Sequence, residues 1–180
     1  MEYKKELTRI AITGGPGTGK STVLELLSKK GYAIVPEAGR ILITENQNKN
    51  IDSSKKRASQ EFQNKISKLQ FKLENNFKEG IVFSDRGIVD GYVYSKLNQL
   101  KVPNIITKHG KNRYFLVFIL DSLPVYKNDQ VRLRDEKTAR KIHADLRKAY
   151  LHFGYTPISV PVLPPNERVE FILAKLNSFN

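Results

Sequence analysis

The amino-acid sequence predicts a three-layer α/β fold, in which helices cover both faces of a parallel sheet of roughly five strands. Short apolar runs alternate with amphipathic helical patterns along the chain, without repeats or a low-complexity linker. A glycine-rich turn joins the first apolar run to the first helical pattern. The length of 180 residues and the apolar content of 39% fit a single domain over residues 1–180 with a substantial core.

The first half of the chain begins this alternation. Strands are predicted at residues 9–13, 32–35 and 81–84, and helices at 20–30, 38–45 and 54–78. Gly31 can end the first helix as a left-handed cap, and Pro36 ends the second strand. In the long helix, apolar residues repeat at helical spacing from Phe62 to Leu73, opposite lysines that we interpret as a solvated face. The polar residues 46–52 are expected to form a loop.

The second half of the chain continues the pattern. Helices are predicted at residues 89–100, 135–153 and 166–177, and strands at 114–120 and 158–160. The run 114–120 is the most apolar of the chain, which predicts a central strand. Gly154 ends one helix, and Asn166 is expected to cap the last one.

The most specific motif of the sequence is a phosphate-binding loop. Residues 14–21 read Gly-Gly-Pro-Gly-Thr-Gly-Lys-Ser, a full match to G-x-x-x-x-G-K-[ST]. Glycines let successive N–H groups surround a phosphate, and the N-terminus of the following helix adds partial positive charge. Lys20 is expected to face solvent in the empty loop and to contact the β- and γ-phosphates when a nucleotide is bound. Ser21 is expected to bind Mg²⁺. The expected nucleotide-binding residues are Gly14, Gly15, Pro16, Gly17, Thr18, Gly19, Lys20, Ser21 and Thr22.

An acid–arginine pair follows the strand at 81–84. Ligands of open parallel sheets lie at the carboxyl ends of the strands, so Asp85 is expected to face the phosphate loop. There Asp85 could hold Mg²⁺ together with Ser21. Arg86 could bind an acceptor phosphate or stabilise charge on the transferred group. The alternative is that Asp85 caps a helix and Arg86 lies on the surface.

A second carboxylate, Glu37, follows the strand at 32–35 and is expected at the same edge of the sheet. A carboxylate there could accept the proton of a substrate hydroxyl. Arg40 lies one helical turn later and could pair with Glu37 or with a phosphate. The alternative is a structural glutamate at a helix start, paired with Arg40.

The basic segment over residues 121–140 is predicted to form a lid. Arg132 in this segment could close over a triphosphate, neutralise developing charge and exclude water. Val160, Pro161 and Val162 follow the last strand and are positioned to line a purine pocket. The three histidines, His109, His143 and His152, match no metal or triad spacing, and we interpret them as structural or surface residues.

The composition limits the other function classes. The formal net charge of +13 could indicate a nucleic-acid or anionic-lipid partner, but the lysines are spread along the chain, which favours a nucleotide site on a generally basic surface. The chain has no cysteine, so disulfides and thiolate metal sites are excluded. It has no long apolar run, which predicts that it does not span a membrane, and a cytoplasmic location is the default expectation.

These motifs resemble a family of P-loop proteins called predicted AAA-type ATPases or kinases. That family is similar to the nicotinamide-riboside kinase domain of bacterial NAD regulators and to a eukaryotic GTP-binding trafficking protein. The matching stretches are residues 12–22, 35–40, 84–94, 118–132 and 149–169. Nucleoside and nucleotide kinases are similar in layout. The resemblance implies a P-loop NTPase fold, with Glu37 as the base, Asp85 and Arg86 as the acid–arginine pair, and Arg132 as a lid arginine.

The leading prediction is phosphoryl transfer from ATP–Mg²⁺ to a small nucleoside- or nucleotide-like acceptor. The expected catalytic residues are Lys20, Glu37, Asp85, Arg86 and Arg132. The guanine signature Asn-Lys-x-Asp is absent, which favours ATP over GTP. Two alternatives remain: an NTP-binding switch or slow NTPase that acts through a partner, and a kinase of nucleic-acid 5′ ends, which the basic charge would favour.

Overall fold

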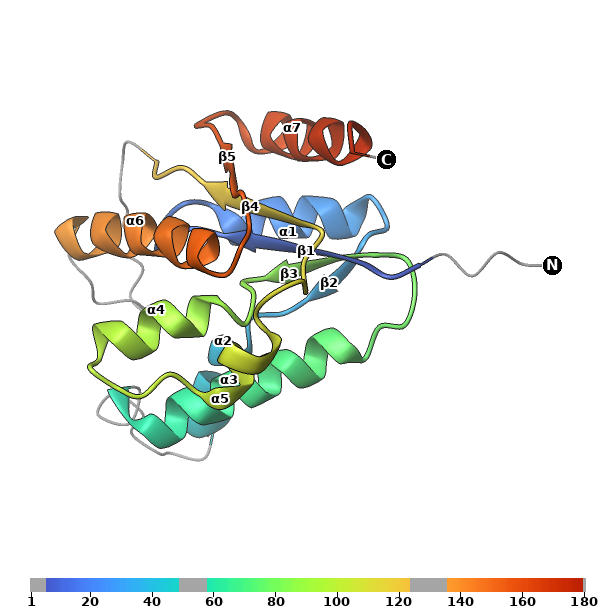
Figure 1. Cartoon of the computed structure of the whole chain (residues 1–180). Coiled ribbons are helices and arrows are strands. Elements are labelled where there is room, and N and C mark those ends of the chain that lie inside the picture. The colour runs from blue at the N-terminus through green and yellow to red at the C-terminus, as the bar shows by residue number, and fades with distance from the viewer. Residues whose placement is uncertain (1–5, 49–57, 124–135, 180) are drawn as a thin grey trace.

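The computed structural model describes residues 6–48, 58–123 and 136–179. Its centre is a parallel sheet of five strands in the order β2-β3-β1-β4-β5 (Figure 1). The strands are β1 (Thr8–Thr13), β2 (Ala33–Val35), β3 (Ile81–Asp85), β4 (Leu116–Leu120) and β5 (Ile158–Val160). The predicted α/β fold with a five-stranded parallel sheet is therefore confirmed. The middle strand is β1, and β4, which was expected to be a central strand, is an inner strand paired with β1 and β5.

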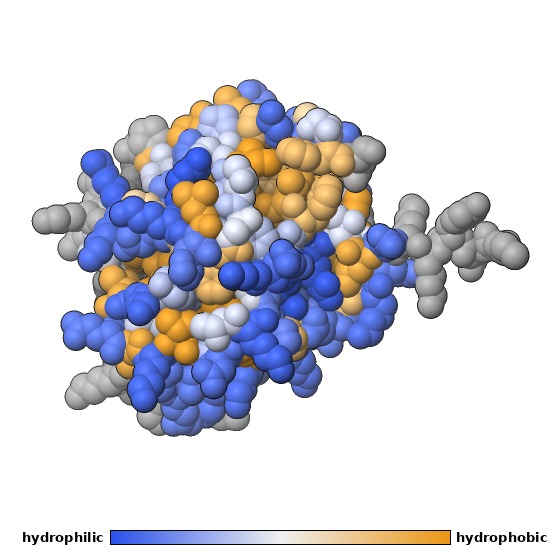
Figure 2. Space-filling model, in the orientation of Figure 1, coloured by the Kyte–Doolittle hydropathy of each residue, from blue (hydrophilic) through white to orange (hydrophobic). Residues whose placement is uncertain are grey.

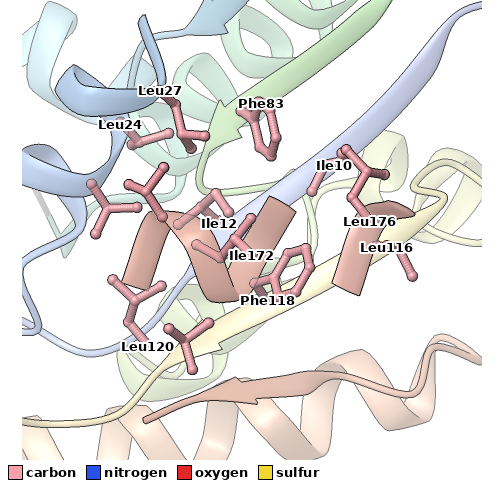
Figure 3. Close-up of a cluster of buried hydrophobic side chains, with 13 residues drawn as sticks. Ile10, Ile12, Leu24, Leu27, Phe83, Leu116, Phe118, Leu120, Ile172 and Leu176 are labelled. Carbon is pink, nitrogen blue, oxygen red and sulfur yellow. The ribbon is translucent and has the colours of Figure 1, made fainter. Parts of the chain in front are cut away.

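Helices flank the sheet on both faces. They are α1 (Lys20–Lys29), α2 (Ala38–Asn48), α3 (Gln60–Asn75), α4 (Asp90–Leu97), α5 (Asn104–His109), α6 (Glu136–His152) and α7 (Pro165–Asn177). On one face, Ile10 and Ile12 of β1 pack against α1 and α7, as the side chains in Figure 3 show. On the other face, Ala11 packs with residues of α4, α5 and α6. Adjacent residues of β1 thus serve opposite cores, as the alternation of a buried strand requires.

Several helix boundaries differ from the predicted ones. The α2 helix continues to Asn48 through part of the expected loop, and residues 49–57 lie outside the described residues. The N-cap of α3 is Ser59, whose hydroxyl accepts a hydrogen bond from the N–H of Phe62. Asn166 does not cap α7, because Pro165, with its fixed φ, is the first helical residue. The short α5 helix was not predicted, since its six residues carry too little periodicity.

The surface agrees with the interpretation of the lysine face. Lys65, Lys68 and Lys72 of α3 are exposed, and hydrophilic residues dominate the lower part of the face in Figure 2. Hydrophobic residues on this face gather mainly near the C-terminal end of α7, where Phe115 and Phe179 are exposed. Within the described ranges, no helix is both long and apolar enough to cross a bilayer.

Candidate functional site

The carboxyl ends of β1, β2 and β3 meet at one edge of the sheet. Ile12 of β1 is in register with Asp85 of β3, and Val35 of β2 is in register with Ser84. The chain leaves β1 into the phosphate loop and leaves β2 toward Glu37. The parallel register therefore brings together three segments that the sequence analysis singled out separately, as expected for a ligand site in this class of sheet.

The phosphate loop has the backbone shape that its glycines permit. Gly14, Gly17 and Gly19 have φ angles of 144°, 73° and 82°, and Gly19 directly precedes α1. A Cβ atom on Gly14 would lie 2.9 Å from the carbonyl oxygen of Leu120, so the close approach of β4 also requires glycine. The loop thus places backbone N–H groups at a helix N-terminus, which suits a phosphate.

Lys20 does not face solvent in this loop. Its side chain is only 5% exposed, and its ammonium donates hydrogen bonds of 3.0 Å to the carbonyl oxygens of Gly14 and Gly15. The expectation of a solvent-facing Lys20 was wrong, because a buried ammonium needs acceptors and the loop offers its own carbonyls. The phosphate position lies along the same loop, so the ammonium is already close to it.

Ser21, Glu37 and Asp85 line one cavity of about 500 Å³. The hydroxyl and the carboxylates are hard oxygen ligands of the kind that Mg²⁺ prefers when phosphate oxygens complete its coordination. Asp85 does not cap the following helix, because α4 begins at Asp90 with Val89 as its N-cap. Among the described residues, no group of three or more His, Cys, Asp or Glu side chains forms a metal site by itself.

Arg86 is buried rather than on the surface. It is 6% exposed and has a φ of 68°, a left-handed conformation that few residues other than glycine adopt. Its Nε donates to Oε1 of Glu37 at 3.0 Å, and its Nη1 donates to Oδ1 of Asp90 at 3.2 Å. Its guanidinium also lies 5.3 Å from the centre of the Tyr94 ring. Arg86 is therefore an ion-pair partner of Glu37, and Arg40 is exposed.

Glu37 and Arg86 also line a second cavity of about 520 Å³ between α2, α3 and α4. Phe62, Ile66 and Tyr94 contribute apolar walls, and polar groups are added by Gln63, Ser67 and Gln70. Pro16 of the phosphate loop lies at its border. A mostly apolar cavity of this size with a few convergent polar groups suits a small organic molecule. Glu37 lines both cavities and therefore stands between them.

The buried carboxylate of Asp90 holds Arg86 in place and links it to β1 and α6. Its Oδ1 accepts hydrogen bonds from Thr13 Oγ1 at 2.6 Å and from Arg86, and its Oδ2 accepts from the Tyr150 hydroxyl at 2.7 Å and from the Gly87 N–H at 3.2 Å. Burial, followed by the negative charge of Asp90, raises the pKa of Tyr150 well above its ordinary value, which keeps the hydroxyl a donor. The sequence analysis assigned no role to Asp90. Its spacing of four residues from Arg86 could have indicated an ion pair between the two.

A second buried carboxylate, Glu74, supports the backbone of Arg86. It accepts hydrogen bonds from Gln70 at 3.1 Å and from Tyr114 at 2.9 Å, and it pairs with Arg113. Burial raises the pKa of Glu74, although Arg113 opposes that effect. Gln70 in turn donates to the carbonyl oxygen of Arg86 at 3.1 Å and accepts from the Ala38 N–H at 3.2 Å. Its amide therefore joins α2, α3 and the end of β3.

The remaining predicted residues are not gathered into these cavities. Arg132 lies outside the described residues. Val160 is buried in the core and Val162 is exposed, and residues 160–162 line neither cavity. Thr22 is exposed on α1.

His143 lies closer to the phosphate loop than its surface interpretation suggested. A Cβ atom on Gly15 would lie 3.5 Å from the Cβ of His143, and Nε2 lies 3.9 Å from Oδ1 of Asp121. Burial lowers the pKa of His143, Asp121 opposes this, and Lys20 adds to it. The loop, α6 and the end of β4 therefore meet at this histidine.

The parallel sheet and the phosphate loop together define the P-loop NTPase fold. A family model described as an AAA domain matches residues 9–168, and the chain belongs to that family. No curated protein matches the chain.

Solved structures of other proteins share this fold, and two of the three described here are named as kinases. A NadR protein in complex with NR has a TM-score of 0.67 and 20% identity over 85% of this chain, which spans 45% of the NadR chain. Shikimate kinase from Aquifex aeolicus vf5 has a TM-score of 0.58 and 21% identity, covering 95% of this chain and 97% of its own. Deoxyadenosine kinase from M. mycoides with bound dATP has a TM-score of 0.52 and 20% identity, and the match covers 94% of this chain and 100% of the deoxyadenosine kinase chain. Neither the family nor these structures support a nucleic-acid or lipid partner.

Proposed function

We propose that this chain transfers a phosphoryl group from ATP–Mg²⁺ to a hydroxyl of a small nucleoside- or nucleotide-like acceptor. The observation that carries the proposal is the pair of adjoining cavities that share Glu37. One contains Ser21 next to the phosphate loop, and the other is large enough for a small organic acceptor. A nucleotide kinase needs these two compartments at one edge of the sheet.

The nucleotide would be held by residues 14–22. In this proposal the loop N–H groups surround the phosphates, and Lys20 exchanges its carbonyl acceptors for phosphate oxygens. Ser21 and Asp85 would hold Mg²⁺, which offsets negative charge on the phosphates when it is bound. The side chains supply position and charge, and little covalent chemistry is asked of them.

Glu37 would accept the proton of the acceptor hydroxyl. Its ion pair with Arg86 fixes the carboxylate at the border of the two cavities. Arg86 would act mainly through this pairing and through its positive charge near the transferred group. Because phosphoryl transfer also depends on positioning, the same carboxylate would orient the hydroxyl while it accepts the proton.

Residues 121–140 would act as a lid of the same domain. Arg132 is the arginine that we propose for contact with the transferred phosphate, since a lid cation adds charge and excludes water. The positions of Asp121 and His143 beside the loop support this assignment, because they place both flanks of the segment at the nucleotide site.

The test is a transfer assay with ATP–Mg²⁺ and a panel of nucleosides, riboside cofactors and shikimate-like polyols, with Lys20→Ala as the inactive control. We expect one acceptor class to yield phosphorylated product, and Lys20→Ala to weaken ATP binding at least tenfold. ATP binding without transfer to any acceptor would contradict the proposal.

An NTP-binding switch or slow NTPase is the second candidate. The observation that favours it is the ion pair of Glu37 with Arg86, since that contact occupies a carboxylate oxygen that a base would need for the acceptor hydroxyl. Slow ATP hydrolysis whose rate stays the same when any acceptor of the panel is added would support this candidate instead.

A further inference from the structure

Arg168 reaches the phosphate loop from the far end of the chain. It lies on α7, and its Nη1 donates a hydrogen bond of 2.6 Å to the carbonyl oxygen of Thr18, 150 positions earlier. A Cβ atom on Gly19 would lie 3.6 Å from the same nitrogen. The side chain is only 2% exposed. Arg168 therefore contacts the loop directly from behind, through its backbone.

The charge of Arg168 is poorly compensated. Within the described ranges its Nε and Nη2 are buried without a hydrogen-bond partner, and no carboxylate forms an ion pair with it. Burial lowers the pKa of Arg168, and the charge of Asp121 only partly opposes this. A buried cation without a paired anion is costly. Such a cost is understandable where the adjoining site is built for an anion, and the phosphate loop is such a site.

The hydrogen bond also determines how one peptide group faces. Thr18 stands between Gly17 and Gly19, both with positive φ, so the Thr18–Gly19 peptide could rotate easily. In a trans peptide the C=O and the N–H point in opposite directions. Because Arg168 holds the carbonyl toward α7, the N–H of Gly19 points away from α7.

We propose that Arg168 is a positioning residue of the phosphate loop. It holds the Thr18–Gly19 peptide so that the Gly19 N–H faces the phosphates, and its charge adds to their attraction. This inference rests on the proposed nucleotide site and extends it to a residue that contacts no nucleotide itself. The α7 helix, whose other inward residues belong to the core, thereby becomes part of the binding site.

The experiment measures nucleotide affinity in the full chain by competition against a fluorescent ATP analogue, which confines the signal to the nucleotide site. ATP–Mg²⁺, ADP–Mg²⁺ and AMP are compared in the wild type, Arg168→Met, Arg168→Gln and Arg168→Lys. Arg147→Met removes an exposed arginine of α6 and serves as the matched control. All measurements are made well below the unfolding midpoint of each variant.

We expect Arg168→Met and Arg168→Gln to lower the affinity for ATP and for ADP by about 10- to 100-fold, the range for the loss of a hydrogen bond to a charged group. The affinity for AMP should fall less, because AMP lacks the phosphate nearest this part of the loop. Arg168→Lys should recover part of the affinity for ATP and ADP. If Arg168→Met does not fold, Arg168→Gln decides. Wild-type affinities for ATP and ADP, or equal losses for ADP and AMP, would overturn the role of Arg168 alone. A wild type without nucleotide affinity would overturn the proposed function as well.

Discussion

Thr13 and Asp90 lie 77 positions apart, and the Thr13 hydroxyl donates a 2.6 Å hydrogen bond to the Asp90 carboxylate. Thr13 is the last residue of β1, directly before the phosphate loop, whereas Asp90 begins α4. The same carboxylate oxygen also accepts from Arg86, which holds Glu37. One buried oxygen therefore joins the strand that carries the loop to the residue between the two cavities. A disturbance on either side is expected to reach the other.

The first prediction concerns that carboxylate. Asp90→Asn keeps the shape but removes the charge between Arg86 and three other donors, so a buried pair is broken. We expect a loss of about 3–5 kcal/mol in the free energy of unfolding. Urea denaturation measures it. Glu25→Gln removes an exposed carboxylate and should leave the free energy of unfolding nearly unchanged. Similar small effects of both substitutions would contradict the anchoring role of Asp90.

The second prediction concerns Gly87, which lies under two tyrosines. A Cβ atom there would lie 2.6 Å from the hydroxyls of both Tyr114 and Tyr150. We expect Gly87→Ala to destabilise the protein by about 1–3 kcal/mol through overpacking, visible as a lower thermal midpoint. Gly39→Ala is the matched control, because its Cβ would find ordinary contacts of 3.6 and 3.7 Å within a helix. Gly39→Ala should leave stability unchanged or raise it.

The third prediction tests the metal role of Asp85. If this carboxylate helps to hold Mg²⁺, Asp85→Asn should reduce the gain in ATP affinity that Mg²⁺ gives over EDTA, while binding in EDTA stays the same or improves. Calorimetric titration under both conditions measures the difference. Asp145→Asn on α6, which lines neither cavity, should preserve the gain. An undiminished Mg²⁺ effect in Asp85→Asn would remove the metal assignment.

The fourth prediction tests Glu37 as the base. Glu37→Gln retains a hydrogen-bond acceptor for Arg86 but cannot take up a proton. We expect ATP affinity to be retained and transfer to the identified acceptor to fall by about 10²–10⁴-fold. Glu61→Gln, an exposed position on α3, is the control. Transfer at the wild-type rate in Glu37→Gln would show that Glu37 is not the base.

The fifth prediction concerns the proposed lid. Hydrogen exchange over residues 121–134 should slow when ATP–Mg²⁺ is added, because a closing lid gains hydrogen bonds and loses solvent contact. Arg132→Ala should bind ATP but transfer phosphate more slowly. Equal exchange with and without nucleotide would argue against a lid in this segment.

The parts of the site that could be predicted are those set by strand ends. Once Asp85 and Glu37 were placed after parallel strands, the sheet brought them to one edge beside the loop. The position of Lys20 could not be predicted this way, because it depends on which acceptors a folded loop offers.

The long-range contacts of Asp90, Gln70 and Arg168 were also beyond sequence reasoning. Each joins elements that are distant in the chain, and no local spacing marks a hydrogen bond across 77 or 150 positions. Helix boundaries failed for a related reason. Ser59 caps α3 through a single local hydrogen bond, and the apolar repeat from Phe62 to Leu73 does not mark where that cap lies.

The carbonyl contacts of Lys20 set a threshold for what can occupy the loop. Its ammonium already donates to the carbonyl oxygens of Gly14 and Gly15 and to the Thr18 hydroxyl, so an incoming anion must compete with these acceptors for the cation. A simple anion such as chloride brings a single acceptor and therefore replaces few of the hydrogen bonds that Lys20 would lose. A polyphosphate chain presents several oxygens at once and can compensate the loss. We therefore expect the loop to bind simple salt anions weakly and to favour ligands that bring many acceptors in one molecule.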